Sequence, residues 1–216
     1  MNTPPGPERA KWSPEEVANN LAGAVLWNTL SLIKELEPIL ARPRWCPPIL
    51  WNLLQATTKG TSPWAKLCGE CGIFAWFVAD WVVAGKCGPL ADGIRRAMAD
   101  NIESRLAPLH HSPDYLLENP GADPAASHLA FYSHRASNLV PYLITTRPEA
   151  FTQYHQVLKG SKPDWDALAI LAWKRMGGQP RIGAHPILTH QAATMPDLYE
   201  SYSSMLETPA QSQTPE

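Results

Sequence analysis

The sequence predicts an all-α fold: a single helical-bundle core domain with extended N- and C-terminal arms. Segments with helix start and stop residues follow one another through most of the 216 residues. The sequence has no alternating apolar and polar run long enough to indicate a strand. With 44% hydrophobic residues and nine tryptophans, the chain can build one substantial core.

The domain limits follow from composition. Residues 1–12 are polar and rich in proline, so they bury too little apolar surface to order alone and predict a flexible N-terminal arm. Residues 13–177 predict the all-helical core domain. Residues 178–216 are rich in Pro, Gly, His, Gln, Ser and Thr, and they predict a polar C-terminal arm with one short helix at 197–206.

The first predicted helix starts at a capping box, because Ser13 and Pro14 are followed by glutamate at position 16. Its apolar residues recur at steps of four or seven on one face: Val17, Leu21, Val25, Leu32, Leu36 and Leu40. The helix is expected to end at Arg42-Pro43-Arg44. A shorter helix should begin at Pro47 or Pro48 and end in a turn at 57–60.

The most apolar stretch runs from Pro63 to Gly88 and predicts the central core helix. From Gly72 to Ala84 the apolar side chains lie all the way round a 3.6-residue helix, which indicates burial on every side. Asp80 lies inside this run, and a bilayer span needs about 20 apolar residues. We therefore expect no membrane partner.

Four further helical segments are predicted. One starts at Pro89, with a stripe of Leu90, Ile94, Ala97, Met98, Ile102 and Leu106. Residues 107–124 read as a loop, and a helix over 125–144 should kink or end at Pro141. Another restarts at 147–149 and stops at Gly160. The last, from Pro163, has acidic residues in its first turn and basic residues in its last, which complements the helix dipole.

The four cysteines allow two interpretations. Cys68 and Cys71 form the only close pair, and Cys46 and Cys87 could complete a zinc site. A second close pair is missing, and Cys68 and Cys71 lie one turn apart in the core segment, so buried, reduced thiols are favoured. No metal and no cofactor is predicted. The N-terminal sequence lacks a hydrophobic signal core, which favours a cytosolic compartment.

The seven histidines match no HExxH pattern, and no GxSxG or phosphate-binding glycine loop accompanies them. We therefore predict no catalytic residues and no enzyme. A metal- or histidine-dependent enzyme remains an alternative, and it would need a pocket lined by His110, His111 and Asp114 or by the cysteines.

Basic residues in the second half of the core domain or its last helices, Arg96 among them, are interleaved with tyrosines and small polar residues, as in grooves that bind single-stranded RNA. Solvated helix faces carry the same pattern. The net charge of −2 argues against binding through bulk positive charge but allows a local basic groove. The predicted RNA-binding residues are Arg95, Arg105, Tyr132, Ser133, Arg135, Asn138, Arg147, Lys174 and Arg175.

The order of several motifs resembles that in coat proteins of flexuous filamentous positive-strand RNA viruses, the potexvirus-like group. The motifs are Arg105-Leu106-Ala107-Pro108, the Pro-rich stretch 112–124, the aromatic block 128–132, LITTRPEAF at 143–151 and DWDALAILAWKRMGGQPRI at 164–182. Tyr132, Ser133 and His134 stand where the family has an aspartate, so its ion pair is not carried over, and only Arg105 matches by context. A second alignment instead places residues 46–52 and 74–77 on the family's motifs.

The resemblance implies a structural coat or nucleocapsid protein that polymerises into a helical filament around single-stranded RNA, independently of RNA sequence. Its copies would contact one another through the terminal arms, and it would occur in the virion and the host cytoplasm. The alternative is a helical module that binds protein partners or oligomerises without nucleic acid. Salt separates the two, because RNA-driven assembly weakens as ionic strength rises.

Overall fold

The computed structural model describes residues 13–40, 63–107, 139–158, 164–175 and 186–207. These ranges form six α-helices and one short 3-10 helix, without a strand among them. The prediction of an all-α fold is therefore confirmed. The predicted arm at 1–12 and the short helix expected from Pro47 or Pro48 lie outside the described residues.

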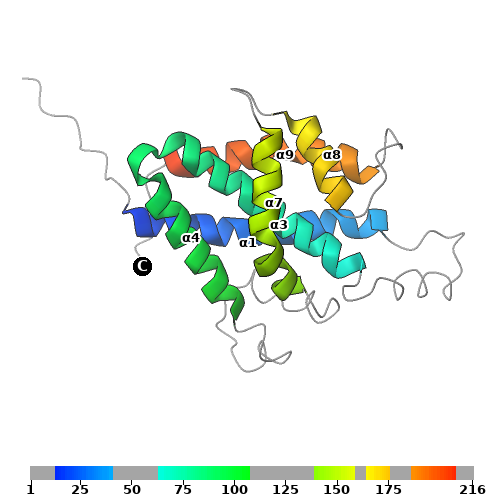
Figure 1. Cartoon of the computed structure of the whole chain (residues 1–216), viewed down its shortest axis with the longest axis horizontal. Coiled ribbons are helices and arrows are strands. Elements are labelled where there is room, and N and C mark those ends of the chain that lie inside the picture. Colours follow the sequence, from blue (N-terminus) through cyan, green and yellow to red (C-terminus); the bar gives the residue numbers. More distant parts are fainter. Residues whose placement is uncertain (1–12, 41–62, 108–138, 159–163, 176–185, 208–216) are drawn as a thin grey trace, which may run out of the picture.

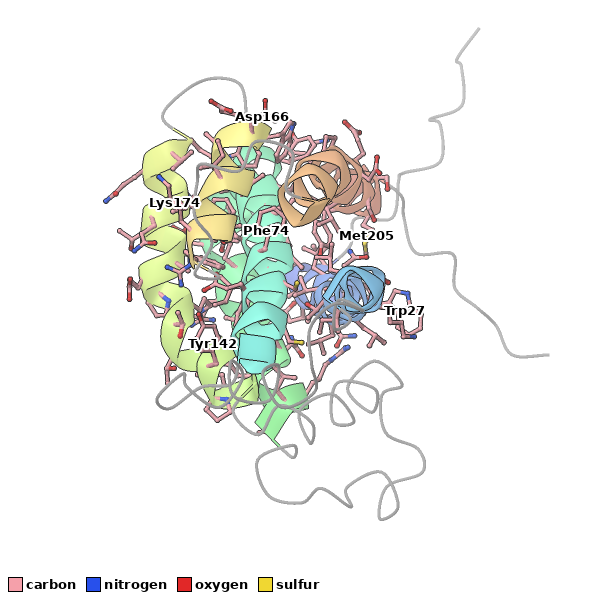
Figure 2. All side chains as sticks on the ribbon, turned by 90° about the vertical axis from the view of Figure 1, so that its right-hand side faces the viewer. Trp27, Phe74, Tyr142, Asp166, Lys174 and Met205 are labelled. Atoms are coloured by element: carbon pink, nitrogen blue, oxygen red, sulfur yellow. The ribbon has the colours of Figure 1, made fainter. Side chains whose placement is uncertain are left out.

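Helix α3 (Pro63–Lys86) lies in the middle of the molecule. Figure 2 shows α7 (Leu139–Val157) on one side of it, and α1 (Pro14–Leu40) and α9 (Pro186–Glu207) on the other. The 3-10 helix η1 (Gly88–Leu90) leads into α4 (Ala91–Leu106), which packs on α1 and α3 (Figure 1). Helix α8 (Trp165–Arg175) packs mainly on α9.

The predicted capping box starts α1. The backbone N–H of Ser13 donates to Glu16 Oε2 at 3.0 Å, and the N–H of Glu16 donates to Ser13 Oγ at 3.2 Å. Two amides at the free helix end are thereby satisfied. Leu21, Val25 and Leu32 of the predicted face are buried, so the helix periodicity correctly identified the side that packs on the core.

The prediction of a central core helix at Pro63 to Gly88 is confirmed, because every residue from 71 to 80 is buried. No face of a helix that is enclosed by neighbours on both sides contacts water, which explains why its apolar residues are not confined to a single stripe. The segment Cys68–Lys86 is long and apolar enough to cross a membrane by length and composition alone, but 83% of its apolar stretch is buried inside the protein. Cys68 and Cys71 are both buried and form no disulfide.

The predicted break between Pro141 and Pro148 is wrong, since one helix, α7, contains both prolines. The loop expected at 108–124 and residues 125–138 of the helix expected over 125–144 lie outside the described residues. Pro141 lies in the first turn, where a backbone N–H has no helical partner and none is lost. Pro148 does remove one internal hydrogen bond. The helix continues because Leu143, Ala150 and Tyr154 form one buried face that packs on α3.

The predicted core boundary at residue 177 also needs correction. Instead of a short helix at 197–206 within a polar arm, α9 spans Pro186–Glu207 and packs on α1, α3 and α8. Leu198 and Tyr202 belong to the hydrophobic core. Pro196 lies inside this helix, and the polar composition around it concealed the earlier start.

Gly69 of α3 lies against the Tyr142 ring of α7, and alanine should not fit there. A Cβ atom at Gly69 would lie within van der Waals overlap of the Tyr142 ring, so we expect Gly69→Ala to lower the free energy of unfolding by about 1–3 kcal/mol. Gly93 of α4 has no neighbour within 4 Å of such an atom. Gly93→Ala should instead stabilise by about 0.5–1 kcal/mol, because alanine favours the helix. Urea unfolding of both variants tests the difference; equal effects would contradict the close α3–α7 contact.

Candidate functional site

A pocket of about 370 Å³ opens between α3, α4 and α7. Its charged lining consists of Asp80 from α3, Asp92, Arg95 and Arg96 from α4, and Arg147 from α7. Its apolar lining consists of Trp76, Ala99, Pro148 and Phe151. The pocket brings together two predicted RNA-binding residues, Arg95 and Arg147, that are far apart in the sequence.

Arg95 is held by a buried carboxylate. Its Nε donates to Asp80 Oδ1 and its Nη2 donates to Asp80 Oδ2, both at 2.7 Å, while the Asp80 side chain is only 7% exposed. Asp92 adds a weaker contact, 3.5 Å from its Oδ1 to Arg95 Nη1. The hydrogen bonds to Asp80 raise the pKa of Arg95 above its ordinary value. The guanidinium is therefore fixed in place and permanently charged.

Arg147 is held from two sides. Its Nη1 lies 3.2 Å from Glu103 Oε1, and its guanidinium carbon lies 4.2 Å from the centre of the Trp76 ring. A cation over an aromatic face is attracted by the ring quadrupole, so Trp76 orients Arg147 without using any of its N–H donors. The sequence identified Trp76 as a core residue, and only the structure shows this second role.

Two other basic side chains complete the surroundings of the pocket. Arg96 is exposed and has no hydrogen-bond or ion-pair partner within the described part of the chain. His155 Nε2 lies 4.0 Å from Asp80 Oδ2 but does not line the pocket, and its ring contacts the Phe77 ring edge-on. Arg96 was one of the basic residues noted in the sequence but was not among the nine predicted to bind RNA.

Arg175 has a different role from the one predicted. It is 8% exposed, its Nε donates to Glu70 Oε2 at 2.8 Å, and its Nη1 donates to Gln153 Oε1 at 2.8 Å. Glu70 is fully buried and also accepts from the Tyr142 hydroxyl at 2.6 Å. Arg175 therefore joins α8 to α3 and α7 inside the protein and cannot reach a ligand at the surface.

The remaining predicted residues are dispersed. Arg105 lies between α4 and α1, where its Nη2 donates to the carbonyl and the side-chain oxygen of Asn19 at 3.2 and 2.7 Å. Lys174 is exposed on α8 and does not line the pocket. The other four, Tyr132, Ser133, Arg135 and Asn138, lie outside the described residues.

Burial of ionisable groups predicts that the protein loses stability at alkaline pH. Burial raises the pKa of the Cys71 thiol and of the Tyr154 phenol well above their ordinary values. In the unfolded chain these groups ionise near pH 8.5 and pH 10, so above about pH 8.5 the unfolded state holds fewer protons than the folded state. The contribution of these two groups to the free energy of unfolding should therefore be constant below that pH and fall above it.

Tyr154→Phe tests this alkaline loss. The Tyr154 hydroxyl is buried without a hydrogen-bond partner in the described structure, so its removal should stabilise the protein by about 1 kcal/mol near pH 7. It should also reduce the loss between about pH 8.5 and pH 10.5, measured by urea unfolding in the presence of a reductant. A wild-type stability that does not change over this range would refute the expectation.

The enzyme alternative named a pocket lined by two histidines and an aspartate, or by the cysteines. His110, His111 and Asp114 lie outside the described ranges, and within those ranges no group of three or more His, Cys, Asp or Glu side chains is placed to hold a metal ion. The pocket instead offers oriented N–H donors that suit an anionic ligand. No protein-family model, no curated protein and no solved structure matches the chain.

Proposed function

We propose that the chain is a non-enzymatic, coat-type structural protein that binds single-stranded RNA and polymerises with copies of itself around it. The observation that supports this proposal is the convergence of Arg95, Arg96 and Arg147 on one open pocket. Arginine donates hydrogen bonds in the planar geometry that phosphate accepts, so the α4–α7 face offers a place for the RNA backbone.

The net charge of −2 does not conflict with this proposal. Salt screens charges that lie beyond about one Debye length, roughly 8–10 Å at physiological salt, so acidic residues on distant faces have little effect on hydrogen bonds between these arginines and a phosphate. Contacts to the backbone carry no sequence information, so binding should be independent of RNA sequence. Energy for assembly would come from contacts between subunits as well as from RNA.

The set of proposed RNA contacts differs from the nine residues predicted from the sequence. Arg175 is excluded by its internal bonds, and Arg105 is engaged with Asn19. Arg96 joins Arg95 and Arg147, while Lys174 adds an exposed positive charge on α8. Tyr132, Ser133, Arg135 and Asn138 stay predictions.

The alternative, a helical interaction module without nucleic acid, is favoured by one observation. Trp27 is 51% exposed on the outer side of α1, and Leu90 is 57% exposed in η1. Large exposed apolar side chains are frequent at protein interfaces. Figure 2 shows that Trp27 faces away from α3, so a partner bound there would leave the arginine pocket open.

Purified particles test the two functions against each other. The ratio of absorbance at 260 and 280 nm is measured with negative-stain microscopy, before and after nuclease and high-salt treatment. The coat proposal expects filaments that contain nucleic acid and shorten or dissociate after these treatments. A monomer or closed oligomer that is free of nucleic acid and does not bind added RNA at low salt would overturn it and favour the interaction module.

A further inference from the structure

We infer that the α3–α4–α7 pocket is a binding site for a single phosphate group, with Arg96 as the residue that contacts the anion first. The inference deepens the proposed function, and rests on it where RNA supplies the phosphate. A free phosphate or a small phosphate ester offers the same chemistry.

The three arginines keep unused donors. A guanidinium carries five N–H donors. Arg95 uses three of its donors in contacts with Asp80 and Asp92, and the third of these is long, at 3.5 Å. Arg147 has one contact with Glu103, and Arg96 has none among the described residues. Most of the available donors therefore belong to Arg96 and Arg147, which lie on different helices that flank the pocket.

Two of the three arginines are held before any ligand binds. Asp80 is buried and fixes Arg95 through two short hydrogen bonds, and Trp76 and Glu103 fix Arg147. A ligand therefore orders only the Arg96 side chain, which lowers the entropy cost of binding. One exposed arginine without a partner among the described residues, in a pocket with two arginines that are held, suits a small anion better than a flat basic surface would.

The charges around the pocket nearly cancel. Three arginines face Asp80 and Asp92 in the lining, and Glu103 offsets Arg147 from outside it. Binding must therefore depend on directed hydrogen bonds more than on bulk charge. Asp92 is 88% exposed at its side chain and contacts Arg95 only weakly, so it opposes an entering anion. Removal of this charge should strengthen binding.

Each charge change at the pocket has a matched control elsewhere. Arg96→Gln removes one positive charge from the pocket, and its control, Lys34→Gln, removes one from an exposed site on α1. Asp92→Asn removes one negative charge from the pocket, and its control, Asp166→Asn, removes one from an exposed site on α8. Inorganic phosphate and phenyl phosphate are the probes, titrated into the full-length chain and followed by NMR. Phenyl phosphate adds a ring that can contact Phe151.

We expect Arg96→Gln to weaken phosphate binding about tenfold, because a charge-assisted hydrogen bond is lost. Asp92→Asn should strengthen it about threefold, and both controls should stay within about twofold of the wild type. If Arg96→Gln and Lys34→Gln have the same effect, binding follows net charge and the site is refuted. Absence of phosphate binding to the wild type refutes it as well.

Oligouridylate RNA, titrated into the same variants, separates this inference from the proposed function. RNA binding by the wild type without phosphate binding, or with no loss in Arg96→Gln, overturns the pocket site and leaves the RNA function standing. Phosphate binding that Arg96→Gln removes, without RNA binding, keeps the pocket site and overturns the RNA function. RNA binding weakened by Arg96→Gln and strengthened by Asp92→Asn supports both.

Discussion

Arg175→Met should lower the free energy of unfolding by about 3–5 kcal/mol, because it leaves Glu70 charged and unpaired inside the core. Glu70 is fully buried, and Arg175 supplies its only ion pair in the described structure. Methionine keeps much of the side-chain volume and removes the charge. Urea unfolding followed by circular dichroism gives the value.

Two further variants show whether the unpaired charge is the cause. Lys174→Met changes the neighbouring, exposed cation of the same helix and should alter stability by less than about 0.5 kcal/mol. Glu70→Gln in the Arg175→Met background should recover a large part of the loss, because a neutral amide can still accept from Tyr142. Equal losses in Arg175→Met and Lys174→Met would contradict the buried ion pair.

Phe77→Ala should destabilise the protein by about 3–5 kcal/mol through the cavity that it leaves between α3 and α7. Phe77 is fully buried, and its ring lies 5.5 Å from that of Phe151 and 4.9 Å from that of Tyr154, centre to centre. These three rings pack α3 against α7, and both helices line the pocket. A Phe77→Ala variant that folds should therefore also bind phosphate less well.

Trp27→Ala is the control for this loss. It removes a larger aromatic side chain, but one that is 51% exposed, so the free energy of unfolding should fall by less than about 1 kcal/mol. Thermal unfolding of both variants under identical conditions makes the comparison. A Trp27→Ala variant that loses as much as Phe77→Ala would show that the exposed face of α1 is covered in solution.

Local signals predicted the helices that carry them. Ser13 and Glu16 cap α1 as expected, and the unbroken apolar run of α3 correctly indicated burial on all sides. Pro141 and Pro148 misled because local propensity predicts a break, whereas the face of α7 that packs on α3 holds the helix together. The extent of α9 was missed for the same reason: tertiary contacts, not composition, set its length.

The candidate site was only partly predictable. A pattern of basic and aromatic residues identified Arg95 and Arg147 but could not distinguish them from Arg175, which belongs to the interior. The distinction depends on where two acidic residues of α3 lie: Glu70 reaches α8, and Asp80 reaches α4. Both lie in an apolar segment, and an acidic residue in such a segment signals a buried basic partner.

The central claim, that RNA phosphates bind at the arginine pocket, is tested most directly by the salt dependence of RNA binding. Binding of oligouridylate to the wild type and to Arg96→Gln is measured by fluorescence anisotropy between about 50 and 200 mM salt. Because the pocket takes one phosphate, this contact should contribute about −0.7 to the slope with which the logarithm of the binding constant falls as the logarithm of salt rises. Arg96→Gln should bind more weakly, with a slope smaller in magnitude by about 0.7. No binding at low salt, or an identical slope in both proteins, would contradict the account.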